Sequence, residues 1–260
     1  YWIIYFFNIV MLLAVRVAGD NSGGATRRID LGFIRFQPTE LSKILLIMFF
    51  ARYLMAHEED LNTLKTILTS VGLVAVPLAL IAIQPDLKNT ITVAVVFCAL
   101  MYIAGLSYKI IGGIVGVAVP LFIVAMLLIT QTDLPIIDDY QKGRIMSWLY
   151  PEDEEYEDLA IQQNNSITAI GSGQLTGKGY NNNSVSSANK GNFVSQIQTD
   201  FIFAVAGEEL GFVGSAGIVI LLLLIVIECI LTSRRAKDLS GKIICCGVAA
   251  VVGFQSFLNI

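Results

Sequence analysis

Apolar runs long enough to cross a lipid bilayer recur along almost the whole of this 260-residue chain. A bilayer-spanning helix needs about 20 mostly apolar residues. Charged residues make up only 15% of the chain, whereas soluble domains carry about 25%, so the charges are too few to cover a water-exposed surface. We therefore predict an all-α fold, a polytopic transmembrane helical bundle with a large extracytoplasmic loop.

The expected spans are joined mostly by short connections. They cover about 1–19, 39–56, 66–84, 88–105, 109–130, 201–232 and 243–260. We interpret residues 1–260 as a single membrane domain. Because Tyr1 and Ile260 both lie inside apolar runs, we expect this domain to be incomplete and the chain to be a piece of a longer protein.

Basic residues set the expected orientation of the spans. The connection after the sixth span is rich in cations, and the positive-inside rule assigns it to the cytoplasm. Its basic residues are Arg234, Arg235, Lys237 and Lys242. Alternation then assigns 20–38, 85–87 and 131–200 to the extracytoplasmic side, although 20–38 also carries arginines.

The long loop, 131–200, changes composition midway. Acidic residues are frequent in its first part, as far as Asp158, and none occurs between Leu159 and Thr199. We interpret the acidic part as a solvated surface segment. The later part is rich in Gly, Ser and Asn, and it suits either a flexible linker or a close-packed backbone platform. Both interpretations stay open.

The run after the loop is longer than a span requires. As one helix, residues 200–232 would measure about 50 Å, against about 30 Å for the hydrocarbon core. The first turns must then project beyond the lipid or line a wet cavity. Gly207 and Gly211 in these turns form a small-xxx-small pair that suits close helix packing.

Acidic and basic residues gather at the span ends on the extracytoplasmic side, where they suit an anionic substrate and proton transfer. They are Arg27, Arg28, Arg35, Glu40, Lys43, Asp86, Arg144, Lys178, Asp200, Glu208 and Glu209. The single histidine, His57, and the four cysteines, which lie in or near apolar runs, predict neither a zinc site nor a disulfide framework.

Most of these residues also have a structural interpretation. Glu40 and Lys43 have the spacing of an intrahelical pair, which fits a structural role as well as a ligand role. The arginines of 20–38 could meet lipid phosphates. Asp86 directly precedes a span, so an N-cap is its default role. The adjacent carboxylates of Glu208 and Glu209 have no comparably simple explanation.

Ordered motifs connect these residues to a known family. The runs are RRIDLG at 27–32, FQPTELSK at 36–43, QPDL at 84–87, DYQ at 139–141 with Arg144, GSG at 171–173, GKG at 177–179, TDFIF at 199–203 and EELGFVG at 208–214. From about Arg27 onward the chain resembles the SEDS family of FtsW, RodA and SpoVE. Departures are Gln196 in place of an upstream glutamate, Lys88 in place of a glycine, and a partly changed run at 161–166 that keeps Gln162 and Ser166.

The resemblance implies a bacterial cytoplasmic membrane protein of ten transmembrane helices, of which this chain would hold the third to the ninth. It implies polymerisation of lipid II into glycan strands for cell shape, division or sporulation, with a class B penicillin-binding protein as partner. Nucleic acid is not an expected partner. By motif match, the family's catalytic aspartate falls on Asp200.

The expected reaction is an inverting glycosyl transfer. Asp200 would act as general base on the acceptor hydroxyl, and the leaving pyrophosphate would develop negative charge. Cationic side chains or a bound divalent cation, Mg or Mn, can stabilise that charge. The residues expected to bind substrate are Arg35, Lys43, Arg144, Lys178, Gln162 and Ser166, supported by Arg27, Glu40, Asp86, Glu208 and Glu209. The alternatives are a flippase for lipid-linked precursors and a non-catalytic scaffold.

Overall fold

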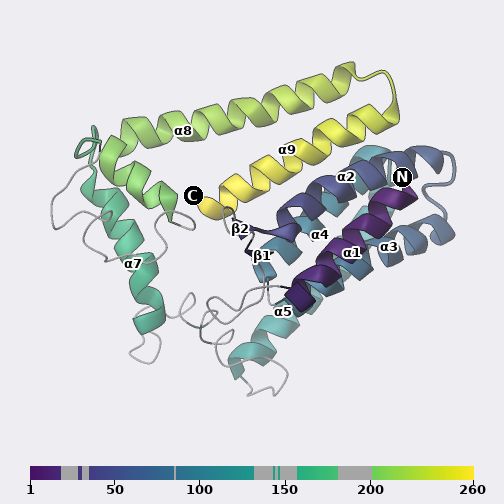
Figure 1. Cartoon of the computed structure of the whole chain (residues 1–260), viewed down its shortest axis with the longest axis horizontal. Helices are drawn as coiled ribbons and strands as arrows, with labels where there is room; N and C mark the ends of the chain where they lie inside the picture. Colours follow the sequence, from purple (N-terminus) through teal and green to yellow (C-terminus); the bar gives the residue numbers. More distant parts are fainter. Residues whose placement is uncertain are drawn as a thin grey trace. The chain divides into compact units, whose positions relative to one another are not determined.

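A computed structural model describes residues 1–18, 29–30, 35–84, 86–131, 143, 146, 157–180 and 201–260. Helices dominate these residues, which confirms the all-α class (Figure 1). They are α1 (Trp2–Ala18), α2 (Pro38–Ala56), α3 (Leu64–Ile83), α4 (Leu87–Ala104), α5 (Tyr108–Gln131), α7 (Glu157–Ser172), α8 (Ile202–Arg235) and α9 (Leu239–Asn259). Two short strands, β1 (Ile29–Asp30) and β2 (Arg35–Phe36), pair antiparallel with Ile29 opposite Phe36.

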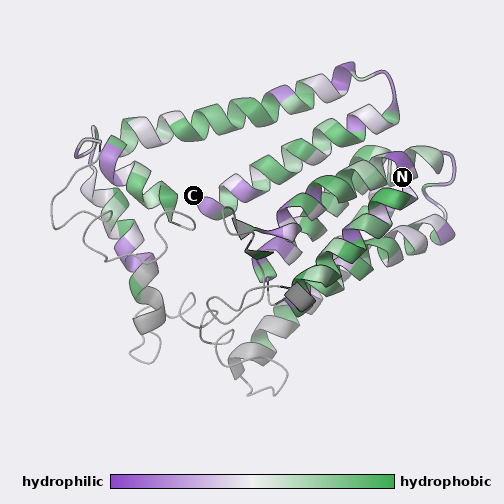
Figure 2. Ribbon diagram, in the orientation of Figure 1, coloured by the Kyte–Doolittle hydropathy of each residue, from purple (hydrophilic) through white to green (hydrophobic). Residues whose placement is uncertain are grey.

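A helix lies at each of the seven apolar runs. Among the described residues, α3, α4, α8 and α9 are long and apolar enough to cross a membrane, and α1 contains a shorter apolar helix over Trp2–Val15. Figure 2 shows these helices as mainly hydrophobic along their lengths, with hydrophilic residues toward the connecting turns. The membrane crossings of α2 and α5 stay predictions. The helix α7, inside the long loop, was not predicted.

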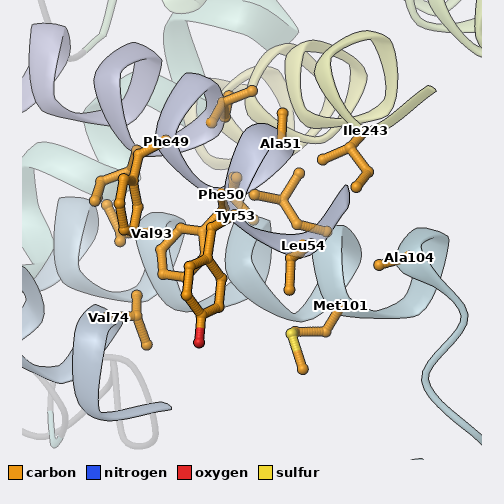
Figure 3. Close-up of a cluster of buried hydrophobic side chains, with 14 of the residues drawn as sticks. Phe49, Phe50, Ala51, Tyr53, Leu54, Val74, Val93, Met101, Ala104 and Ile243 are labelled. Carbon is orange, nitrogen blue, oxygen red and sulfur yellow. The ribbon is translucent and has the colours of Figure 1, made fainter. Parts of the chain in front are cut away.

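The chain divides into two compact units, which are described separately. The first unit consists of Tyr1–Ile111 with Leu222–Leu258, and the second of Gly112–Leu221 with Asn259–Ile260. In the first unit, α1 packs against α2 and α3, and α4 packs against α2 and α3. Aromatic side chains of α2 lie at the centre of this core, where Phe49, Phe50 and Tyr53 are almost completely buried (Figure 3).

A proline inside α3 is compensated by a neighbouring helix. Pro77 has no backbone N–H, so the carbonyl oxygen of Leu73, one turn earlier, loses its intrahelical donor. The Tyr5 hydroxyl of α1 donates a hydrogen bond of 2.9 Å to that oxygen. Membrane helices tolerate proline when a neighbour satisfies the freed backbone group, and Tyr5 performs this role here.

The second unit contains α7 and the start of α8. The backbone of α8 is not helical at Gly211, where φ is 66° and ψ is −167°. The span expected over 201–232 is therefore not one continuous helix. A short segment, 202–210, precedes the break and a long segment, 212–235, follows it. A positive φ is costly for residues with a side chain, which explains why a glycine stands at this position.

Candidate active site

Lys43 is a buried cation of the first unit. It lies near the start of α2 and is 2% exposed. Its ammonium Nζ forms an ion pair of 2.8 Å with Glu40 Oε2, one turn earlier, and donates a hydrogen bond of 3.0 Å to Asn89 Oδ1 on α4. Burial of an ammonium is costly unless it is paired and hydrogen-bonded, and both conditions are met here. The expected intrahelical pair of Glu40 and Lys43 is present.

Asp86 is the buried anion of the first unit and lies at the N-cap of α4. Its carboxylate accepts hydrogen bonds from the backbone N–H of Asn89 at 3.3 Å, the Asn89 side-chain amide at 2.8 Å and Gln37 Nε2 at 3.1 Å. The expected N-cap role of Asp86 is therefore confirmed. The carboxylate also has two side-chain donors, which is more than a cap requires.

The network reaches a third helix at its other end. Glu40 is half exposed, and its Oε2 accepts a hydrogen bond of 3.3 Å from Gln255 of α9. Polar contacts thus run from Gln37 through Asp86, Asn89, Lys43 and Glu40 to Gln255. We call these six residues the α2–α4–α9 network. It contains two carboxylates and one ammonium.

The amide members of this network were not among the residues predicted from the sequence. The position of Asn89 could have indicated a hydrogen bond to Asp86, because it lies three residues after this N-cap aspartate, which is the spacing of a capping box. Its bond to Lys43 could not be anticipated, since it depends on how α2 and α4 pack. The position of Gln255 inside an apolar run does not indicate which residue it contacts.

A glycine-containing turn in the second unit satisfies both ends of the broken α8. Before the break, the carbonyl oxygens of Glu208 and Glu209 accept hydrogen bonds from the backbone N–H groups of Lys178 and Gly179, at 2.9 and 3.1 Å. After the break, the N–H groups of Phe212 and Val213 donate to the carbonyl oxygens of residues 174 and 175, at 2.8 and 3.2 Å. Groups that a helix end leaves unpaired are thus bonded on both sides.

The turn approaches α8 so closely that side chains are excluded. A Cβ atom at Gly173 would meet the backbone oxygen of Gly207, and one at Gly177 would meet that of Glu209. A Cβ at Gly207 would lie 3.0 Å from Ile170 of α7, so Gly207 does support close packing, as expected. Of the two interpretations of the Gly-rich part of the loop, the close-packed platform is correct for residues 171–179.

Lys178 and Glu208 form an ion pair that joins this turn to α8. Lys178 Nζ lies 2.7 Å from Glu208 Oε1, and Glu208 is 2% exposed. Because Glu208 lies on the segment before the break, the pair reinforces the backbone contacts of the same turn. Glu209 is partly exposed beside it, and Ser166 is buried on α7. The expected substrate-binding lysine is therefore engaged with a buried carboxylate.

Several predicted site residues lie outside the described residues: Arg27, Arg28, Arg144 and Asp200. Arg35 and Gln162 are described only as parts of the backbone of β2 and α7. Because Arg35, Lys43, Asp86, Arg144 and Asp200 all fall on the expected extracytoplasmic side, the sequence also predicts a polar cavity that they bound, and this cavity stays a prediction. Within the described ranges the structure does bring Lys43 and Asp86 together, through Asn89.

The residues that the structure describes include no group of three or more His, Cys, Asp and Glu side chains that could hold a metal ion. The donors of Asp86 are amide and backbone N–H groups, which suit a carboxylate that is satisfied without a metal. These residues therefore do not fit a divalent-cation site by themselves. The Mg or Mn expectation stays untested, since Asp200 and Arg144 lie beyond this part of the chain.

Long apolar helices with charged groups buried at their ends define this chain as a multi-pass helical membrane protein. The family model for FtsW, RodA and SpoVE, described as cell cycle proteins, matches residues 1–260. The chain belongs to this family, and it is a protein of the bacterial cytoplasmic membrane.

The curated relatives carry names from cell-wall synthesis. The chain is 34% identical over 257 residues to peptidoglycan glycosyltransferase MrdB of Escherichia coli K12, covering 99% of this chain and 66% of the relative. It is 28% identical over 261 residues to the probable peptidoglycan glycosyltransferase FtsW of Haemophilus influenzae, covering 99% and 63%. The chain thus spans slightly less than two thirds of the length of these relatives.

Two solved structures show the same fold. A chain from a peptidoglycan synthase complex superposes with a TM-score of 0.75 at 24% identity, covering 99% of this chain and 68% of that one. The rod shape determining protein RodA of Thermus thermophilus superposes with a TM-score of 0.63 at 23% identity, covering 98% and 63%. These likenesses support the helical membrane fold.

Proposed function

We propose that the protein containing this chain is a peptidoglycan glycosyltransferase that polymerises lipid II at the outer face of the cytoplasmic membrane. The observation that carries the proposal is the buried link from Lys43 through Asn89 to Asp86, in a chain whose family relatives are named peptidoglycan glycosyltransferases. Ionisable groups buried among membrane helices are costly and commonly mark functional sites.

The chemistry begins with an acceptor hydroxyl, the 4-hydroxyl of GlcNAc, which attacks the anomeric carbon of a MurNAc linked to undecaprenyl pyrophosphate. Asp200 accepts the hydroxyl proton as general base. The new glycosidic bond forms as the bond to pyrophosphate breaks, and the electron pair leaves with the phosphate oxygen. Because an α-linked donor gives a β-linked product, the transfer inverts configuration and requires no covalent intermediate.

The leaving pyrophosphate needs positive charge nearby. Lys43 is our leading candidate among the described residues, because its ammonium is held by neighbours on two helices. Arg144 and Arg35 are further candidates, since a guanidinium binds phosphate oxygens in pairs. Lys178 is a weaker one, because Glu208 already offsets its charge.

We propose a class B penicillin-binding protein as the partner that cross-links the strands. Support comes from the similar solved chain, which belongs to a peptidoglycan synthase complex described as coordinating polymerisation and cross-linking. A flippase would be expected to carry charged groups near the middle of its spans. Glu40 and Lys43 lie in the first two turns of α2 and Asp86 caps α4, which favours chemistry at the membrane surface.

The proposal is tested by Asp200→Asn in the full-length protein, assayed for glycan polymer from lipid II together with its partner. The amide keeps the side-chain volume but is a very weak base, so polymerisation should fall at least about 10²-fold. The melting temperature should stay close to that of the wild type. The control is Asp60→Asn, which changes an exposed aspartate in the turn after α2 and should leave activity intact. Polymer yield from Asp200→Asn within a few-fold of wild type would refute the base assignment.

A further inference from the structure

We propose that Asn89 is a positioning residue of the glycosyl-transfer site, acting through Lys43. This inference rests on the proposed function, but its structural part concerns contacts that can be tested independently. The Asn89 side chain is hydrogen-bonded to both a buried ammonium and a buried carboxylate. It therefore joins a cation of α2 to an anion of α4.

Both ends of the Asn89 amide are hydrogen-bonded. Its Oδ1 accepts from Lys43 Nζ at 3.0 Å, while its Nδ2 donates to Asp86 Oδ2 at 2.8 Å and to Thr39 Oγ1 at 3.3 Å. Asn89 is 5% exposed, and Lys43, Asp86 and Thr39 are buried at least as completely. Water therefore competes little for these bonds, and each has a fixed direction.

An amide is suited to this position because its two ends have opposite character. Its oxygen can only accept a hydrogen bond and its nitrogen can only donate one. The ammonium requires an acceptor, and the carboxylate requires a donor, so only one orientation of the Asn89 amide satisfies both. A leucine would satisfy neither charge. An aspartate would satisfy Lys43 but would bring a second carboxylate next to Asp86.

The consequence is that the direction of the Lys43 ammonium depends on α4. Glu40, the other partner of Lys43, is half exposed and lies on the same helix as Lys43. Its ion pair therefore cannot fix the position of the ammonium relative to α4. Loss of the Asn89 amide would leave the ammonium bonded to Glu40 and free to turn toward solvent. If Lys43 stabilises charge on the leaving pyrophosphate, such a displacement lowers the rate of the chemical step more than it lowers substrate binding.

The test compares four full-length proteins in the polymerisation assay: wild type, Asn89→Leu, Lys43→Met and the double variant. We expect Asn89→Leu to lower kcat by about 10- to 100-fold with a smaller change in KM. Because Asn89 acts through Lys43, the double variant should be no worse than Lys43→Met by more than about threefold. The control is Asn8→Leu, which removes an equally buried amide of α1 that has no hydrogen-bond partner in the part of the chain that the structure describes, and kcat should be unchanged.

Two results would overturn the inference: a kcat for Asn89→Leu within threefold of wild type, or losses that multiply in the double variant. Failure of the proposed function would look different, because the wild type itself would then make no polymer. In that case the melting temperatures of the same four proteins still test the contact. Coupled changes in melting temperature support the bond between Lys43 and Asn89, whereas additive changes refute it.

Discussion

At the scale of single residues, neutral amide side chains connect the charged groups of the first unit. Gln37 and Asn89 donate to Asp86, and Gln255 donates to Glu40. A fourth amide, Gln84, donates to the carbonyl oxygen of Leu12 and so ties the end of α3 to α1. Because hydrophobic association between helices is weak in lipid, such hydrogen bonds contribute directly to which helices pair.

The bond between Tyr5 and Leu73 gives a prediction at this scale. Tyr5→Phe removes the hydroxyl that satisfies the carbonyl oxygen freed by Pro77, and it should destabilise the protein by about 1 kcal/mol. In a Pro77→Ala background the restored N–H can bond Leu73 within α3, so the same substitution should cost much less. Melting temperatures in detergent measure both effects. Equal losses in the two backgrounds would contradict the compensation.

Residue types at the site were predictable, whereas their partners were not. Lys43, Asp86 and Glu208 were identified because charged side chains at the ends of apolar runs need an explanation. Their partners depend on which helices meet, and hydrophobic patterning carries little of that information. For Lys178, the expected phosphate contact stays a prediction, and the ion pair with Glu208 that the structure shows was not anticipated.

At the scale of elements, the break in α8 explains how a run that is too long for the bilayer is accommodated. The segment 212–235 measures about 36 Å at 1.5 Å per residue, close to the hydrocarbon thickness of about 30 Å. The segment 212–235 is thus long enough to cross the bilayer without residues 202–210. The excess length was evident from the sequence. The position of the break was not, because Gly207, Gly211 and Gly214 are equally able to provide one.

Close contact between the turn and α8 predicts a sharp difference between two glycines. Gly173→Ala would bring a methyl group against the backbone of residues 207 and 208, which cannot rotate away, and should cost about 1–3 kcal/mol. Gly171→Ala, at a position inside α7, meets none of the described residues within 4 Å and should be neutral or slightly stabilising. Thermal unfolding of the two variants measures the difference. Equal melting temperatures would show that the turn does not rest on α8.

At the scale of the whole molecule, hydrophobic runs predicted where the principal helices lie. Helix ends agreed closely because turn residues and charges interrupt the runs at the membrane surface. The helix α7 was not predicted because its sequence is polar and contains no apolar run long enough to cross a bilayer. The division into two compact units was also not predicted, since α5 and α8 each contribute residues to both.

The orientation of the chain in the membrane is tested with two introduced cysteines in a background without Cys98, Cys229, Cys245 and Cys246. Ser186→Cys lies in the predicted extracytoplasmic loop and Ser240→Cys at the start of α9, beside the basic connection. An impermeant thiol reagent added to intact cells should label Ser186→Cys only, because basic connections stay in the cytoplasm. Labelling of Ser240→Cys alone would reverse the topology.

The turn that bonds both ends of the broken α8 also determines how this region opens. Amide protons of Lys178, Gly179, Phe212 and Val213 are all held by one contact between the turn and the helix. Separation of the two surfaces frees these four amides together, although they lie in stretches of chain more than thirty residues apart. In hydrogen–deuterium exchange they should therefore share one opening rate and behave as a single cooperative unit of unfolding.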